Sequence, residues 1–170
     1  LGLLQEKGAL ALKKNAGALS VGFYKVEFQD GAYLINGKST GTDDFIAFLG
    51  TLDDYIVTEY IVAHSFLQDI NRYAPNIIRL IVINPDGRSP KLISSYLRIG
   101  QQSTGYTELT PSGGIFCGIG LEDGRLFDAK LFDGPIVSSV SKHPDTDRAI
   151  EGHLPHWKET IESIYELCKY

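Results

Sequence analysis

One stretch near the N-terminus, residues 10–23, constrains the fold of this chain more than any other. Its sequence, LALKKNAGALSVGF, joins an apolar run that ends in two lysines to a loop of small residues and a second apolar run. A strand, a small-residue loop and a strand allow backbone N–H groups to approach phosphate oxygens closely, and the lysines add positive charge. The Walker A pattern G-x-x-x-x-G-K-[ST] is absent. The stretch therefore predicts either a phosphate-binding loop or an ordinary β-hairpin with an exposed lysine pair.

The composition excludes several classes of protein. The chain has 170 residues, enough for one domain or two small ones, and its net charge of −5 argues against nucleic acid as a principal partner. No apolar run approaches the roughly 18 residues of a membrane span, and the first residues do not form a signal peptide. Cys117 and Cys168 have no metal-ligand spacing, which favours a reducing, cytoplasmic setting, although one disulfide remains open. The chain starts at Leu1 and lacks methionine, so we interpret it as a fragment of a longer protein.

Short apolar runs between Gly, Asp and Asn turns predict an α+β fold with mainly antiparallel strands. A helix is expected to end at Gly8, another to be capped by Thr42, a third to start at Ser65, and a closing helix to take Pro155 as its first position. A seam near residues 62–65 separates a smaller part, 1–62, from a larger part, 63–170. The strands are expected at residues 9–14, 21–28, 32–36, 55–62, 76–83, 92–99, 115–119 and 126–132.

Three of these apolar strands carry a charged residue. Glu59 lies in YIVTEYIV, Arg79 in NIIRLIVI and Arg98 in YLRIG. A charge inside a buried strand costs free energy unless it is paired or used. Glu59 could instead face water from an edge strand. The arginines could bind an anionic ligand, or could pair internally with Glu59 or Glu108.

The order of these features resembles that of ATP-grasp proteins, and the chain is most similar to the sugar-transfer-associated branch. The resemblance is carried by LKKNAGALSVGF, VTEYIVAH, APNIIRLIVI, YLRIG, the SGGI step and HPDTDRAIEGHLPHW. It implies two α+β lobes with mainly antiparallel sheets that enclose a nucleotide cleft. Residues 1–62 would form the smaller lobe, with the phosphate loop and the hinge strand. Residues 63–170 would form the larger lobe, with the phosphate- and metal-facing strands and a C-terminal helix.

The resemblance also implies roles for particular residues. Lys13 would contact the α- and β-phosphates, while Arg79 and Arg98 would face the γ-phosphate or an acyl phosphate. These three are the implied catalytic residues. The implied ATP-binding residues are Lys13, Lys14, Gly17, Ser20, Gly22, Glu59, Tyr60, Ile61 and Val62.

Magnesium would accompany ATP and needs oxygen ligands. The candidate carboxylates are Glu108, Glu122, Asp123 and Asp145, each of which could equally be a solvated surface group. His153 and His156 are three residues apart, but no third ligand joins them at a convincing spacing, which favours a structural reading.

Three positions depart from the family pattern: Lys14 replaces a proline, Leu109 an asparagine and Gly120 an aspartate. The resemblance implies an ATP-dependent ligase that joins a carboxylate to an amine or similar nucleophile through an acyl phosphate. Its substrate would be a small molecule or a saccharide-linked precursor. The departures leave open whether the chain is an enzyme. The alternatives are a non-catalytic nucleotide- or partner-binding domain of the same fold and an interaction domain without a nucleotide.

Overall fold

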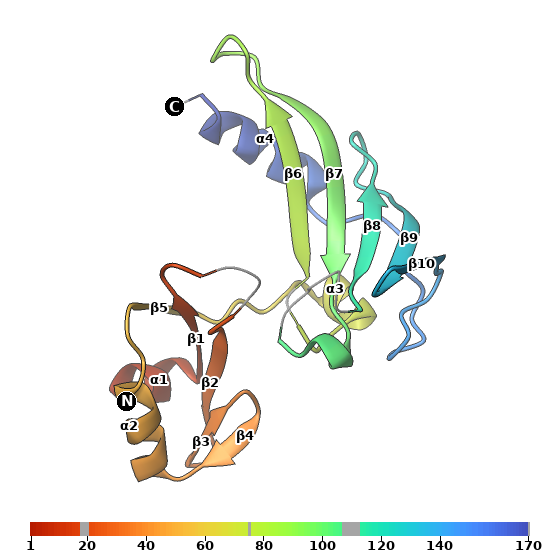
Figure 1. The fold of residues 1–170 in the computed structure, drawn as a ribbon. Coiled ribbons are helices and arrows are strands. Elements are labelled where there is room, and N and C mark those ends of the chain that lie inside the picture. The colour runs from red at the N-terminus through yellow and green to blue at the C-terminus, as the bar shows by residue number, and fades with distance from the viewer. Residues whose placement is uncertain (18–20, 75, 107–112, 170) are drawn as a thin grey trace. The chain divides into compact units, whose positions relative to one another are not determined.

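The computed structural model describes residues 1–17, 21–74, 76–106 and 113–169, so Ser20, Glu108 and Leu109 lie outside the described residues. The chain divides into two compact units, Leu1–Val62 (unit 1) and Ala63–Tyr170 (unit 2) (Figure 1). Each unit contains helices and a five-stranded antiparallel sheet. The predicted α+β class is therefore confirmed.

Unit 1 is a sheet with helices against one of its faces (Figure 1). The strand order is β4-β3-β2-β1-β5. The elements are α1 (Gly2–Lys7), β1 (Ala9–Lys14), β2 (Tyr24–Gln29), β3 (Ala32–Ile35), β4 (Lys38–Thr40), α2 (Thr42–Gly50) and β5 (Tyr55–Glu59).

The core of unit 1 follows from the alternation of side chains along β1. Leu10 and Leu12 point to the side where Leu4 of α1 and Phe45 of α2 pack, and all four are buried. Because successive strand residues point to opposite faces, Lys13 lies on the face away from this core. We call that side the unit 1 open face.

Unit 2 has the strand order β10-β9-β8-β7-β6. Its elements are α3 (Ser65–Ile70), β6 (Ile77–Ile83), β7 (Lys91–Ile99), the 3₁₀ turn η1 (Gln102–Thr104), β8 (Ile115–Ile119), β9 (Leu126–Asp133), β10 (Ile136–Ser139) and α4 (Trp157–Leu167).

One face of the unit 2 sheet carries the core. Leu97, Ile99, Ile115 and Cys117 are fully buried there, and Trp157 of α4 packs against them. On each strand, the residues whose side chains point away from this core form the unit 2 open face. Its members are Ile77, Arg79, Ile81, Ser94, Tyr96, Arg98, Phe116, Gly118, Phe127 and Lys130.

Several element boundaries differ from the sequence prediction. The strand expected at 21–28 begins only at Tyr24. The strand expected at 55–62 ends at Glu59, and residues 60–64 have no regular secondary structure. Gly41, not Thr42, is the N-cap of α2. Helix α4 begins at Trp157, because His156 adopts a left-handed conformation with φ 56° that cannot belong to the helix.

Within the described residues, no helix is both long enough and apolar enough to cross a membrane.

Candidate functional site

The two lysines at the end of β1 have different surroundings. Lys13 pairs with Ile56 on the unit 1 open face, whereas Lys14 pairs with Tyr55, a member of the core cluster. A Cβ added at Gly22 would lie 3.5 Å from the Lys14 Cβ and 2.7 Å from the Tyr55 hydroxyl, and one at Gly17 would lie 3.5 Å from the same Lys14 atom. The described ends of the loop therefore pack against Lys14, and Gly22, with φ 77°, needs to be glycine. Lys13 presents its ammonium group on the other face.

The entrance of the loop is fixed by hydrogen bonds to Asp54, the residue before β5. The backbone N–H of Asn15 donates to the carbonyl of Asp54 (2.8 Å), and the Asn15 side-chain amide donates to the Asp54 carboxylate (3.1 Å). These bonds hold the first residue after β1, and so fix the direction in which the chain leaves Lys13.

The rest of the unit 1 open face carries an ion pair and an aromatic ring. Lys25 and Glu27 of β2 lie 2.6 Å apart, and the Tyr60 ring centroid lies 4.6 Å from the Lys25 ammonium. Beyond Tyr60, Ile61 and Val62 are 74% and 72% exposed. The backbone N–H and C=O groups of Ile61 and Val62 belong to no strand. They can therefore hydrogen-bond to a planar base.

Glu59 occupies the edge position that the sequence left open as an alternative. Strand β5 is an edge of its sheet, and the exposed Glu59 carboxylate lies 3.5 Å from the Lys7 ammonium. Charge on this strand is therefore solvated and paired rather than buried.

Arg79 and Arg98 lie on the same face of the unit 2 sheet. Arg79 of β6 pairs with Tyr96 of β7, and Arg98 lies two residues beyond Tyr96. Since directly opposed residues share a face and the arginines are diagonal neighbours, their Cβ atoms are about 7 Å apart. Arg79 is exposed and Arg98 half-buried. Two long guanidinium side chains at this spacing can bind one phosphate or carboxylate group together.

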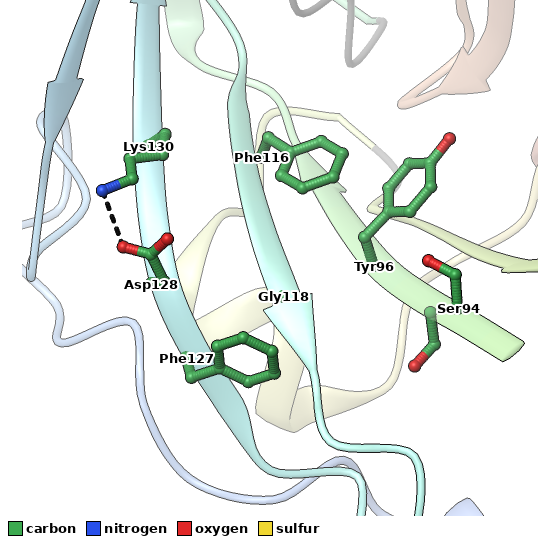
Figure 2. A pocket seen from close by; sticks show the side chains of 8 residues that line it. Ser94, Tyr96, Phe116, Gly118, Phe127, Asp128 and Lys130 are labelled. Atoms are coloured by element: carbon green, nitrogen blue, oxygen red, sulfur yellow. Dashed lines mark ion pairs between the residues drawn. The ribbon is translucent and has the colours of Figure 1, made fainter.

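A cavity of about 260 Å³ opens on the same face, next to Tyr96 (Figure 2). The Tyr96 and Phe116 rings are stacked, with centroids 4.4 Å apart. The Phe127 ring covers Gly118, where an added Cβ would lie 2.6 Å from it. Asp128 and Lys130, 2.6 Å apart, together with Ser94 and Ser95, complete the lining.

A β-bulge in β9 shapes this cavity. Phe116 pairs with Lys130 and Gly118 with Phe127, so β9 has one more residue than β8 over this interval, and Asp128 adopts φ 51°. A bulge redirects side chains, and here it puts Phe127 and Lys130, three residues apart, on one face. The sequence alone did not identify the residues of this cavity. Tyr96 was the available signal, because it lies two residues before Arg98 in the same strand and therefore on the same face.

The His-Pro-Asp-Thr segment supports the turn that follows Arg98. His143 is fully buried, and its Nε2 lies 2.8 Å from the carbonyl of Gly100. Its Nδ1 accepts a hydrogen bond from the backbone N–H of Asp145, so Nε2 carries the proton and donates. The Asp145 carboxylate accepts from the Gln102 N–H at 2.7 Å. This candidate metal ligand therefore has a structural hydrogen bond.

Glu122 and Asp123, the other candidate metal ligands that the structure describes, do not lie together with the arginines. Glu122 and Asp123 are in the turn after β8, at the end of that strand away from Phe116, the partner of Arg98. The Asp123 carboxylate accepts from the Arg125 N–H and lies 3.3 Å from His153; the Arg125 hydrogen bond, reinforced by His153, lowers the pKa of Asp123. No group of three potential metal ligands occurs among residues 1–17, 21–74, 76–106 and 113–169. The described side chains thus do not by themselves fit a magnesium site.

Comparison with known proteins gives one match. A family model described as sugar-transfer associated ATP-grasp matches residues 13–169, which include both lysines, both arginines and the His-Pro-Asp-Thr segment. No curated protein and no solved structure matches the chain.

Proposed function

Because the chain belongs to the sugar-transfer associated ATP-grasp family, we propose that it is an ATP-dependent ligase that joins a carboxylate to an amine or similar nucleophile. Units 1 and 2 would be the two lobes of the ATP-grasp fold. ATP would supply the phosphoryl group that activates the carboxylate as an acyl phosphate. We place the activity in the cytoplasm, where ATP is available and the free thiols of Cys117 and Cys168 stay reduced.

In unit 1, Lys13 is our candidate for the phosphate-binding lysine. It lies on the open face, at the exit of a strand whose following loop contains the glycines at 17 and 22. Lys14, packed against that loop, would hold the loop rather than the nucleotide. The backbone of Tyr60–Val62, which lies outside the regular strands, would receive the adenine.

In unit 2, Arg79 and Arg98 would stabilise the phosphoryl group during transfer. Charge spreads over three oxygens in that transition state, so several fixed cationic donors stabilise it. The carboxylate oxygen would form a bond to the γ-phosphorus as the bond to ADP breaks. The amine would then attack the acyl carbon and displace phosphate. The single observation that carries this proposal is the placement of both arginines on one open sheet face.

ATP binding and turnover test the proposal separately. At 100 times its Kd, ATP should add about 2.7 kcal/mol to the stability of the protein, a shift that is easily measured in thermal unfolding. Lys13→Ala and Arg79→Ala should weaken ATP binding at least about tenfold. The matched controls, Lys38→Ala on the far edge of the unit 1 sheet and Arg88→Ala in the turn after β6, should bind ATP normally. No thermal shift with ATP, or equal effects of test and control variants, would refute the proposal.

A non-catalytic nucleotide-binding domain is the second candidate, and a feature of the turn after β8 favours it. An added Cβ at Gly120 would lie 2.5 Å from the Asp123 carboxylate, so this turn is built without a side chain where family relatives often have aspartate. ATP binding without ADP release across a panel of carboxylates and amines would support this candidate. Turnover would eliminate it.

A further inference from the structure

The cavity on the unit 2 open face combines apolar walls with a polar rim (Figure 2). Its rings are Tyr96, Phe116 and Phe127, and Phe127 is 52% exposed. An aromatic ring left half-exposed beside two others offers a flat surface against which a ligand ring can pack. Because ligand pockets for drug-sized molecules measure about 300–1,000 Å³, a cavity of about 260 Å³ suits one six-membered ring.

The polar rim indicates what kind of ring fits. Lys130 donates to the hydroxyl of Ser139 (2.9 Å) and pairs with Asp128, so these groups are held in place. Asp128 can accept hydrogen bonds, Lys130 can only donate, and Ser94 can do both. The ion pair has no net charge. Such a rim matches a neutral ligand with several hydroxyl groups, because each hydroxyl group can both donate and accept a hydrogen bond.

The position of the cavity relates it to the proposed chemistry. Tyr96 is at once a wall of the cavity and the cross-strand partner of Arg79. If the ring of a molecule occupied the cavity, the rest of that molecule would lie near the Arg79 guanidinium, which we assign to the phosphoryl group. This step rests on the proposed function.

We propose that this cavity binds a sugar ring of the substrate. The C–H face of the sugar packs against Phe127, Tyr96 and Phe116, and its hydroxyl groups hydrogen-bond to Asp128, Lys130 and Ser94. The bulge at Asp128 and the missing side chain at Gly118 create the room for it.

The test is a titration of the ¹⁵N-labelled chain with methyl glucopyranoside, methyl galactopyranoside and the methyl glycoside of N-acetylglucosamine, followed by amide chemical shifts. At least one glycoside should give saturable shifts centred on Tyr96, Gly118 and Phe127. Phe127→Ala should weaken that binding about tenfold, and Gly118→Ala, which forces the Phe127 ring to move, should weaken it similarly. Asp128→Asn should weaken it severalfold.

Two controls make the result specific. Val137→Ala changes a residue of β10 that is 53% exposed, close to the 52% of Phe127, and should leave binding within twofold. Cyclohexylmethanol offers a ring of the same size without the hydroxyl pattern and should bind at least tenfold more weakly than the best glycoside. Equal binding of cyclohexylmethanol, no saturable shift with any glycoside, or an equal response of Phe127→Ala and Val137→Ala would overturn the inference.

The same samples are titrated with ATP, so that the two proposals can fail separately. ATP binding without glycoside binding would refute the sugar site alone. Glycoside binding without ATP binding would refute the ligase and, with it, the role of the cavity as a substrate site.

Discussion

Cys117 shows how burial on the core face of β8 controls a single titratable group. Its side chain has no exposed surface, and burial, with a smaller contribution from the Asp128 carboxylate, raises the pKa of the thiol from 9.0 to about 11. Above pH 9 the unfolded chain therefore loses this proton before the folded protein does. The free energy of unfolding should fall as the pH rises from 9 towards 11.

Urea unfolding of the wild type and Cys117→Ala at pH 8, 9 and 10 isolates this contribution from other groups that titrate in the same range. The stability advantage of the wild type should be constant below pH 9 and should shrink above it. A difference that does not change with pH would contradict the assignment.

Gly124 is a position where the backbone and the packing both require glycine. It has φ 71°, and an added Cβ would lie 2.7 Å from Cγ of Trp157. Gly124→Ala should lower the free energy of unfolding by about 2–4 kcal/mol, because the left-handed conformation and the clash both cost energy. Gly134→Ala is the matched control: its φ is 57° but the space around it is open, so about 1 kcal/mol is expected. Similar losses from both variants in chemical denaturation would show that the Trp157 contact contributes nothing.

At the scale of elements, the His-Pro-Asp-Thr segment holds the turn after β7 through His143 and Asp145. Thr146 extends the attachment, since its hydroxyl donates to the carbonyl of Ile70 at the end of α3 (2.8 Å). The segment thus ties α3 and the exit of the Arg98 strand together through hydrogen bonds that involve buried groups.

His143→Ala should cost about 3 kcal/mol, because it leaves the Gly100 carbonyl and the Asp145 N–H without their partners and opens a cavity. His153→Ala provides the comparison. The His153 side chain is 60% exposed and pairs with the solvated Asp123, so its loss should cost less than about 0.5 kcal/mol. Equilibrium unfolding measures both values, and a small effect at His143 would mean that its hydrogen bonds are replaced by water.

The apolar pattern predicted the longer strands well and the shortest strands poorly. Runs such as NIIRLIVI and IFCGI are apolar along most of their length. The sequence therefore predicted β6 and β8 to within one residue of their observed bounds. Strands β4 and β10 have three and four residues and almost no buried side chain, so no hydrophobic period marks them. The bulge at Asp128 depends on the register with β8, which no local pattern contains.

At the scale of the whole molecule, residues 60–64 connect the two units and lack regular secondary structure. Brief digestion with elastase or chymotrypsin should cut first in this connection, since exposed backbone outside regular secondary structure fits a protease cleft. If Tyr60–Val62 bind adenine as we propose, ATP should slow this cut severalfold in the wild type but not in Lys13→Ala. Mass spectrometry of the fragments checks the position, and an initial cut elsewhere, or no protection by ATP, would contradict the prediction.

The nucleotide site stays a prediction, and within it the sequence pattern alone does not distinguish which of two neighbouring lysines would serve. Lys13 and Lys14 cannot be distinguished in the sequence pattern. The pairing of β1 with β5 places their side chains on opposite faces of the sheet, because a shift of one residue moves a side chain to the other face. The presence of Arg79 and Arg98 on one face likewise followed only from the pairing of β6 with β7. The ring cavity beside them was not predicted, since it is assembled from three strands and a bulge.

The contact between Gly118 and the Phe127 ring has an evolutionary consequence. A side chain at 118 and a large ring at 127 cannot occupy the same space, so in proteins that share this sheet the two positions should covary: where 118 gains a methyl group, 127 should shrink. The pair would then record, in sequence alone, which relatives keep the cavity that we propose as a ligand site.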